Sequence, residues 1–518
     1  MKTILNNLNC SLSTKQDKAS VATYHICNKD GSIRWIWSAK SKQPEFLNFY
    51  HNSGLKSKVF IFLMKLIFAL RLQHLVFGNS KTFVNVSSFS PLHPFRKQEF
   101  FVFTGTVGPN RKYILLLKDH LGSFFKKWGI NDKSHALIQN EVEAIKEVGQ
   151  LTSNKISLPL HFKLENKDNY VPMEQFSKHS TAKFSSDHAS VLKCLLNNTY
   201  SFIGKRSFYQ KHDIIKRIKF LVDKGERNIP FGILHKLELL AIKINPKTIG
   251  VSWGHGDFTP WNMKYTQNQE LYVYDWEMFK KDYPMFFDFF HFFFQNGTLV
   301  QHKSWKGIKA DLKHNFENYF DESFHKDFQL YLDAYLMVNT LSQLELFENQ
   351  ATWHPQVSWL MAVWNEALSE SLEQTVSSKE LLLADVYDYM HKGEYALLKY
   401  PEHNPYQVKE YSDIDICIQK SLAKRVIAYL KEHELVNTLK IDRWSYRTSV
   451  QVVLNNGGFL HLDFVHDFKR KHLRFLDIKT VLKVKLKDAY GIQYLSPKNA
   501  ARYVALFYSL NGQTAPVK

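Results

Sequence analysis

The stretch that decides the fold is WGHGDFTPWNMKYTQNQELYVYDWE, residues 253–277. It holds an Asp and an Asn five positions apart, Asp257 and Asn262, and a further Asp, Asp275, directly after a short apolar run. A carboxylate can accept the proton of an attacking hydroxyl, and carboxylate and amide oxygens are the ligands that Mg²⁺ prefers. The pattern therefore suits phosphoryl transfer, with Asp257 as the catalytic base and Asn262 and Asp275 as metal ligands.

The same stretch has a plainer interpretation as a series of turns, because Asp and Asn favour turn geometry. However, the triplet His255-Gly256-Asp257, the Asn at a fixed offset and the strand-ending Asp are separate features of one pattern. At these positions the chain resembles the aminoglycoside phosphotransferase and choline kinase family, whose catalytic loop reads His-Gly-Asp with an Asn five residues after the Asp. The resemblance implies an α+β, two-lobed, protein-kinase-like fold, use of ATP and Mg²⁺, and a structural role for His255 in holding the loop.

Three strand-like runs between residues 100 and 128 precede this stretch and predict a β-rich first lobe. The loop after the first run contains Gly105, Thr106 and Gly108, and glycines let backbone amides approach phosphate oxygens closely. A loop of this kind is also typical of an ordinary hairpin. The family resemblance favours nucleotide contact by these three residues.

Lysines end the third of these runs. Because side chains alternate between the two faces of a strand, only one of Lys126 and Lys127 can point toward a nucleotide. The resemblance selects Lys127, since family members have a small residue two positions later, as Gly129 is. They also carry an Asn-Glu pair further on, as Asn140-Glu141 is. The resemblance implies that Glu141, on a predicted amphipathic helix, holds the lysine toward the phosphates; a solvent-facing Glu is the alternative.

Residues 170–176 resemble the strand and hinge that join the two lobes in this family. The resemblance implies that the backbone of Glu174 and Gln175 binds the adenine base. The region after this hinge is mostly helical in pattern and predicts the larger lobe. Its apolar run at residues 286–294 is too short to span a membrane, so it predicts a buried helix. Asp288 inside that run would be costly if unpaired, and the resemblance implies that it supports the catalytic loop.

A second group of carboxylates lies near the end of the chain. Asp413 and Asp415 fall in a strand-like run, so alternation places both on one face, and Asp463 lies in a later apolar run. Such a trio can share divalent metal. It resembles the metal-binding carboxylates of nucleotidyltransferases, and the resemblance implies a small α/β nucleotidyltransferase-like domain.

This second resemblance has one departure. Nucleotidyltransferases carry a Gly-Ser turn shortly before the Asp pair, whereas this chain has Leu398-Lys399-Tyr400-Pro401. A domain can keep a fold without its chemistry, so the activity of this region is left open. Two solvent-facing Asp residues on a strand are the plainer alternative, but they do not account for the third carboxylate.

Length and composition allow several domains. The chain has 518 residues, of which 44% are hydrophobic, and a chain of this length divides into roughly two to four domains. We predict a basic, partly helical N-terminal segment at 1–95, a first lobe at 96–176, a second lobe at 177–375 and the nucleotidyltransferase-like domain at 376–518.

The net charge is +19, and the segment before Pro94 carries twelve Lys or Arg against three acidic residues. This asymmetry favours an anionic partner, such as a phosphorylated substrate or a membrane surface, although a basic surface without a partner is an equal alternative. Nucleic-acid binding is not expected, since no binding motif accompanies the charge. Lys65, Arg71 and His74 interrupt the apolar run in this segment, which predicts an amphipathic helix. Core packing is its favoured role, and peripheral membrane contact is the alternative.

The four cysteines lie far apart, without a Cys-x-x-Cys pair, which argues against a zinc site and a disulfide framework. The first residues lack the apolar run of a signal peptide. We therefore expect a cytoplasmic setting.

Together with these patterns, the family resemblance implies an ATP- and Mg²⁺-dependent enzyme that phosphorylates a hydroxyl of a small molecule, such as an amino alcohol, an aminoglycoside or a sugar. Its partners would be that hydroxyl acceptor and a nucleoside triphosphate. Phosphorylation followed by nucleotidyl transfer is an order that activates an alcohol or sugar, so the two regions together suggest precursor synthesis for glycans or lipid head groups. Two alternatives remain: a nucleotide-binding scaffold without catalysis, and a chain whose only active enzyme is the C-terminal region.

Overall fold

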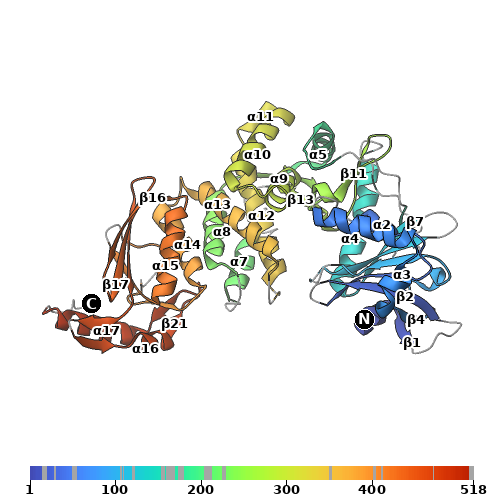
Figure 1. The fold of residues 1–518 in the computed structure, drawn as a ribbon. Coiled ribbons are helices and arrows are strands. Elements are labelled where there is room, and N and C mark those ends of the chain that lie inside the picture. The colour runs from blue at the N-terminus through green and yellow to red at the C-terminus, as the bar shows by residue number, and fades with distance from the viewer. Residues whose placement is uncertain are drawn as a thin grey trace. The chain divides into compact units, whose positions relative to one another are not determined.

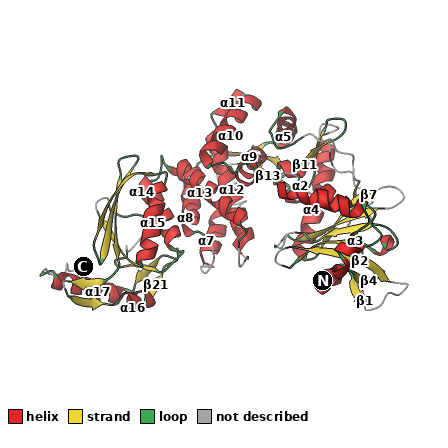
Figure 2. Cartoon of the chain, in the orientation of Figure 1, coloured by secondary structure: helices red, strands yellow, loops and turns green. Residues whose placement is uncertain are grey.

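The chain forms two compact units in the computed structural model. Unit 1 comprises Met1–Ser201, Gly250–His302 and Ile308–His325, and unit 2 comprises Phe202–Ile249, Lys303–Gly307 and Lys326–Lys518. Helices and strands are mixed in both units, so the fold class is α+β (Figure 2). The structure describes residues 1–13, 20–28, 31–49, 55–105, 108, 110–118, 123–152, 158, 170–172, 180–203, 213–223, 229–348, 350, 353–400, 404–409, 412–470 and 472–512. Among these residues, no helix combines the length and apolar character needed to cross a membrane.

An eight-stranded antiparallel sheet forms the first part of unit 1, in the order β1-β4-β2-β3-β5-β6-β7-β8 (Figure 1). Its strands are β1 (Cys10–Ser13), β2 (Ser20–Cys27), β3 (Ile33–Ser38), β4 (Thr82–Val86), β5 (Phe100–Phe103), β6 (Lys112–Lys118), β7 (Ser123–Gly129) and β8 (Tyr170–Pro172).

Both faces of this sheet are covered, because successive side chains point to opposite faces. Phe100 and Val102 of β5 enter a core with helix α1 (Lys2–Asn7). Phe101 enters a second, aromatic core with helix α2 (Leu55–Ala69). A short helix, α3 (Gln73–Val76), follows α2, and the 3-10 turns η1 (Glu45–Phe49), η2 (Gly78–Ser80) and η3 (His93–Phe95) complete this part.

The boundary predicted at 95/96 falls inside this sheet. Strand β3 pairs directly with β5, with Trp35 opposite Phe103 and Trp37 opposite Phe101. The first 95 residues, which the sequence predicted to be a separate and partly helical segment, therefore contribute four strands, β1 to β4, to the sheet that carries β5 to β8. Aromatic side chains are the reason: Trp35 and Trp37 of β3 and Tyr24 of β2 fill a core together with residues of α2.

The rest of unit 1 contains the stretch from Trp253 to Glu277. Strand β10 carries the chain into the loop that holds Asp257, and the hairpin of β11 and β12 leads to Asp275. Strands β9, β10 and β13 form a small sheet in the order β13-β10-β9. The elements that lie wholly or partly in unit 1 are α4 (Asp132–Thr152), α5 (Ser186–Thr199), β9 (Ser201–Ile203), β10 (Ile249–Gly254), η5 (Pro260–Asn262), β11 (Met263–Tyr265), β12 (Leu271–Val273), η6 (Trp276–Met278), β13 (Lys280–Pro284), α9 (Phe287–Leu299), α10 (Trp305–Tyr319) and α11 (Glu322–His325). The predicted buried helix is α9, whose phenylalanines are almost all inaccessible to solvent.

Unit 2 combines a helical layer with a mixed seven-stranded sheet, in the order β16-β17-β18-β15-β14-β22-β21. Its helices are α7 (Ile214–Asp223), α8 (Phe231–Ile244), α12 (Phe328–Glu348), α13 (Pro355–Leu372), α14 (Ser378–Met390), α15 (Lys420–Glu432), α16 (Ile478–Lys483) and α17 (Pro497–Leu510). Its strands are β14 (Tyr395–Leu397), β15 (Asp413–Ile418), β16 (Val436–Arg443), β17 (Arg447–Leu454), β18 (Phe459–Val465), β21 (Lys485–Lys487) and β22 (Gln493–Leu495), with β19 (Phe468–Arg470) and β20 (Leu473–Leu476) as a separate pair.

The boundary predicted at 375/376 falls inside unit 2. Helix α14, which follows that boundary, packs against α8, and the Lys236 ammonium of α8 donates a hydrogen bond to Asp385 of α14 at 2.6 Å. His235 of α8 likewise contacts Glu380 of α14 at 2.9 Å. These buried polar contacts join the helices on both sides of the predicted boundary.

Candidate active site

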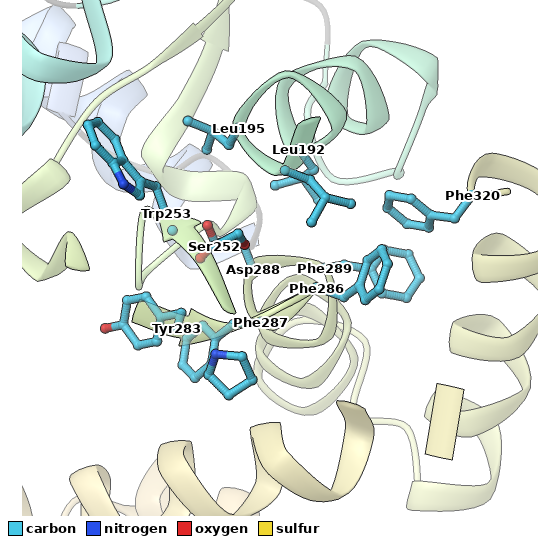
Figure 3. Close-up of a pocket in the computed structure, with 13 residues that line it drawn as sticks. Leu192, Leu195, Ser252, Trp253, Tyr283, Phe286, Phe287, Asp288, Phe289 and Phe320 are labelled. Carbon is cyan, nitrogen blue, oxygen red and sulfur yellow. The ribbon is translucent and has the colours of Figure 1, made fainter. Parts of the chain in front are cut away.

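Asp288 holds the loop that follows β10. Its carboxylate accepts hydrogen bonds from the backbone N–H groups of His255 at 2.6 Å and of Gly256 at 2.8 Å. The side chain lies in the first turn of α9 among aromatic and aliphatic groups, including Phe287 and Phe289 (Figure 3). Burial raises the pKa of this carboxyl, an effect that the two backbone donors oppose. Asp288 therefore fixes the backbone of the loop rather than facing a substrate.

The cavity drawn in Figure 3 is not large enough for a nucleotide. Its volume is about 20 Å³, close to the minimum of roughly 10–15 Å³ that one water molecule requires. It therefore belongs to the support of the loop and not to a substrate pocket.

Gly256 is required where it stands. Its φ is +82°, and a Cβ atom there would lie 2.3 Å from the carbonyl oxygen of Met278 and 2.6 Å from the hydroxyl of Tyr283. That hydroxyl itself donates to the Met278 carbonyl at 2.9 Å. Only glycine combines this left-handed backbone with so close an approach to a neighbouring segment.

The His255 ring links the loop to the end of β12. Its Nδ1 accepts the backbone N–H of Asp257 at 3.2 Å, so its Nε2 carries the proton and donates to the Tyr274 carbonyl at 2.9 Å. The backbone N–H of Tyr274 also donates to the Asn262 carbonyl at 3.0 Å. These contacts fix the position of Asp275, the next residue, relative to the loop. The ring is fully buried, which suits the structural role predicted for it.

The structure brings Asn262 against Asp257. The Asn262 amide nitrogen donates to the Asp257 carboxylate at 2.8 Å and to its backbone carbonyl at 2.9 Å. Since the nitrogen makes both contacts, the amide oxygen is the atom that Asn262 would offer to a metal. The Asp257 side chain is 37% exposed, so its carboxylate is accessible from solvent.

His291 was not predicted. Its Nε2 donates to the other oxygen of Asp257 at 3.1 Å, and the ring is almost fully buried. A signal was present in the sequence, because His291 follows Asp288 by three positions and residues three apart lie on one helix face. Both side chains therefore reach the same loop from α9.

Lys127 connects three elements. Its ammonium contacts Glu141 of α4 at 2.6 Å and Asp275, which follows β12. Burial alone would lower the pKa of Lys127, but the two carboxylates outweigh it and raise this pKa. Burial would raise the pKa of Asp275, but Lys127 and Lys112 hold it well below its usual range. Asp275 is therefore ionised at neutral pH and available as an anionic ligand.

Lys126 lies on the other face of β7. Its side chain is buried, and its ammonium lies over the Trp128 ring, 5.3 Å from the centroid. Strand alternation therefore places Lys127, and not Lys126, at the carboxylates.

Two further charged residues in this cluster, Lys112 and Glu277, were not predicted. Lys112, the first residue of β6, lies 3.5 Å from Asp275 and also pairs with Glu277. Oxygen atoms of Glu141, Asp275 and Glu277 lie within 4.8 Å of one another. Asn140 ties α4 to this region by donating to the backbone carbonyl of Glu277 at 2.8 Å. The cluster thus has three carboxylates and two ammonium groups.

The predicted nucleotide loop is described only in part. Gly105 has a φ of +71°, and a Cβ there would lie 2.5 Å from the carbonyl oxygen of Lys112, so this position also requires glycine. Gly108 is described, whereas Thr106 lies outside the described residues, as do Glu174 and Gln175. Strand β8, which precedes the predicted hinge, pairs with β7.

The second carboxylate group lies in unit 2. Strands β15 and β18 pair in parallel, with Asp415 opposite Asp463, and oxygen atoms of these residues and Asp413 lie within 4.8 Å of one another. Lys399 contacts Asp415 at 2.7 Å, and Arg447 contacts Asp463 at 2.8 Å. Burial raises the pKa of Asp415, and the nearby charge of Lys399 reduces this increase. The two strands thus bring Asp463 close to carboxylates that lie 48 and 50 positions before it in the chain.

No protein-family model matches the chain, and no curated protein matches it. Among solved structures, it is similar to choline kinase LicA from Streptococcus pneumoniae, with 14% identity, 52% of this chain and 93% of that chain covered, and a TM-score of 0.37. It is also similar to an ethanolamine kinase from Plasmodium vivax, with 12% identity, 64% of this chain and 96% of that chain covered, and a TM-score of 0.37. A third similar structure is the ADP-bound aminoglycoside phosphotransferase APH(2'')-Ib, with 14% identity, 51% of this chain and 90% of that chain covered, and a TM-score of 0.35. Likenesses this weak establish neither family nor activity.

Proposed function

We propose that unit 1 is an ATP- and Mg²⁺-dependent kinase that phosphorylates a hydroxyl of a small molecule. The observation that carries the proposal is the contact of Lys127 with both Glu141 and Asp275. A lysine held by a helical Glu, beside an Asp that can bind metal, is the arrangement that positions ATP phosphates in protein kinases. We also propose a two-lobed, kinase-like arrangement of this unit on the same ground.

The residues present fit a magnesium ion. Asp275 offers an ionised carboxylate, and Asn262 offers an amide oxygen, both of which are hard ligands that suit Mg²⁺. The cation, when bound, neutralises phosphate charge during transfer. Lys127 would hold phosphate oxygens, and the glycine loop at Gly105 and Gly108 would bring backbone amides near them.

Asp257 would act as the base. One carboxylate oxygen is held by Asn262 and the other by His291, so the group has a fixed orientation while remaining accessible to solvent. In the proposed reaction, the carboxylate accepts the proton of the acceptor hydroxyl as its oxygen attacks the γ-phosphorus, and the bond from that phosphorus to the ADP oxygen breaks. The chemistry requires no covalent enzyme intermediate.

A mass-spectrometric screen tests this function. The protein is incubated with ATP, Mg²⁺ and pooled amino alcohols, aminoglycosides and sugars, and we expect one acceptor to gain a single phosphoryl group. The pool contains the acceptor classes that the resemblance of the His255-Gly256-Asp257 loop implies. A catalytically inactive scaffold would instead show higher thermal stability with nucleotide but no phosphorylated product and no acceptor-dependent ADP.

His291 provides a second test. The change His291→Ala removes a hydrogen bond to a charged group, worth about 1.5–3 kcal/mol, so we expect turnover to fall roughly tenfold to a hundredfold while the KM for ATP changes little. In the control His291→Gln, the amide can replace the Nε2 donor, and most of the turnover should return. Equal losses in both variants would contradict a role through this hydrogen bond.

We further propose nucleotidyltransferase activity for the carboxylate trio of unit 2, as a second candidate function. The close approach of Asp413, Asp415 and Asp463 favours it, since two-metal sites of this kind assist nucleotidyl transfer. Activation of the phosphorylated acceptor with a nucleotide, in precursor synthesis for glycans or lipid head groups, would then join the two activities, and a cytoplasmic setting would supply the triphosphates.

The change Asp413→Ala tests this second function. We expect release of pyrophosphate from nucleoside triphosphates by the native protein and its loss in the variant, because the metal site loses one carboxylate. The matched control is Asp442→Ala, which removes a half-exposed carboxylate of β16 in the same sheet. Pyrophosphate release that survives Asp413→Ala would refute the assignment without affecting the kinase proposal.

A further inference from the structure

Helix α2 is apolar on two opposite faces. One face packs Met64 and Phe68 into the aromatic core of the unit 1 sheet, beside which α2 lies in Figure 1. The other face exposes large hydrophobic side chains: Val59 is 51% exposed, Phe62 65%, Leu63 48% and Leu66 43%, and Leu70, directly after the helix, is 57% exposed. We call these five residues the α2 stripe.

The spacing of the α2 stripe makes it continuous. Its members follow one another by three, one, three and four positions, which places them along one side of a helix with 3.6 residues per turn. Helix α3, which contacts α2, adds Leu75 and Val76, exposed by 70% and 52%. Single exposed hydrophobic residues are ordinary, but a contiguous set marks an interaction surface.

The sequence on both sides of the stripe carries only basic charges. Between Glu45 and Glu99 the sequence has no acidic residue, and it has seven basic ones: Lys56, Lys58, Lys65, Arg71, Lys81, Arg96 and Lys97. Lys58 and Lys65 are exposed and, from their spacing, lie along one edge of the stripe. Arg71 and His74 are exposed just beyond it.

We propose that the α2 stripe binds the surface of an anionic phospholipid bilayer, with its apolar side chains among the acyl chains and its basic side chains at the head groups. An apolar face edged by Lys and Arg is the pattern of helices that lie in a membrane interface, and anionic lipids attract such residues. A second copy of the chain fits less well, because the stripe would bring identical basic edges together. The inference stands apart from the proposed kinase function.

Vesicle sedimentation tests the proposal with the full chain. We expect the protein to sediment with vesicles of phosphatidylcholine and phosphatidylglycerol and to remain in solution with phosphatidylcholine alone. The variant Phe62→Glu/Leu66→Glu should lose binding. The matched control is Ile242→Glu/Phe507→Glu, whose positions in unit 2 are 63% and 42% exposed and which makes the same change of charge; it should bind like the native chain.

The basic edge is tested separately. The variant Lys58→Gln/Lys65→Gln/Arg71→Gln should reduce partitioning on the order of a hundredfold, about fivefold for each cation lost near the surface. The control Lys58→Arg/Lys65→Arg keeps the charge and should bind normally. Because surface electrostatics are screened by salt, binding of the native chain should also fall as ionic strength rises.

A tryptophan reporter keeps the test independent of any folding defect in the glutamate variant. In Phe62→Trp, brominated acyl chains in the anionic vesicles should quench additional fluorescence, and in Ile242→Trp they should not. Equal quenching in both, or no binding of the native chain to anionic vesicles, would overturn the proposal. Dimers that dissociate in Phe62→Glu/Leu66→Glu, without vesicle binding by the native chain, would identify the stripe as a contact between copies.

Discussion

The change Asp257→Asn is expected to reduce phosphoryl transfer by roughly 10²–10⁴-fold, the range that general base catalysis supplies. The amide has nearly the same shape as the carboxylate but cannot accept the proton of the attacking hydroxyl. Nucleotide affinity should change little, because the phosphates would be held by Lys127, the glycine loop and the metal ligands. Product formation measured by mass spectrometry, with ATP binding measured by calorimetry, separates the two effects.

The matched control for this variant is Asp321→Asn, which makes the same chemical change at an exposed position of unit 1. It should leave both turnover and ATP affinity unaltered. Full turnover in Asp257→Asn would remove the base from the proposed mechanism. A loss of ATP binding equal to the loss of turnover would show that the loop had changed its structure.

The parts of the candidate site that could be predicted are those set by local geometry. Asp257, Asn262 and Asp275 lie within 25 residues, and the β11–β12 hairpin fixes how they approach one another. Strand alternation allowed only one of Lys126 and Lys127 to face the site, the family resemblance selected Lys127, and the structure places the two lysines on opposite faces of β7. In both cases the residues lie close together in the sequence.

The contacts that escaped prediction join distant parts of the sequence. Lys112 meets Glu277 across 165 positions, and His291 meets Asp257 across 34. The Lys112 pairing leaves no periodic signal. The spacing of Asp288 and His291 places both on one face of α9, but it does not say which carboxylate His291 meets, since that depends on how α9 packs against the loop. The number of charged groups in the site was therefore underestimated, because no local pattern places a second lysine beside Asp275.

The segment at 1–95 shows a different limit. Its apolar helix could be predicted from the sequence. Its four strands, however, pair with one another and with β5 through backbone hydrogen bonds, which do not depend on side-chain identity. Composition marked the segment as basic and thus as different from the rest of the chain. The segment nevertheless forms one sheet with β5 to β8. The unpaired N–H and C=O groups at the edge of a sheet can pair with any extended strand that has a suitable apolar face.

The change Lys236→Met is expected to destabilise unit 2 by about 3–5 kcal/mol, the usual cost of removing one partner from a buried ion pair. Lys236 is fully buried, and its three N–H groups donate to Asp385 at 2.6 Å, Asn365 at 2.9 Å and Ser369 at 2.8 Å. His433 holds the other oxygen of Asp385 at 3.2 Å. Without the ammonium, the buried Asp385 carboxylate would keep only the hydrogen bonds from His433 and Asn365. Urea titration of the native and variant chains measures the difference.

The pH dependence of the stability lost in Lys236→Met identifies the cause of that loss. Burial alone would raise the pKa of Asp385, but Lys236 and His433 outweigh it and lower this pKa from its ordinary 3.8. A lowered carboxyl pKa stabilises the fold above the unfolded value, and that stabilisation is lost as pH falls through the folded value. In Lys236→Met burial is largely unopposed, the pKa rises, and the variant should recover relative stability as pH is lowered toward about 4 and the carboxyl takes up a proton.

Two comparisons separate the ion pair from simple packing. The double variant Lys236→Met/Asp385→Leu should be more stable than Lys236→Met alone, because it leaves no unpaired charge in the interior. The control Lys431→Met removes an exposed lysine of α15 and should cost less than about 0.5 kcal/mol. A loss below about 1 kcal/mol in Lys236→Met would mean that water reaches Asp385.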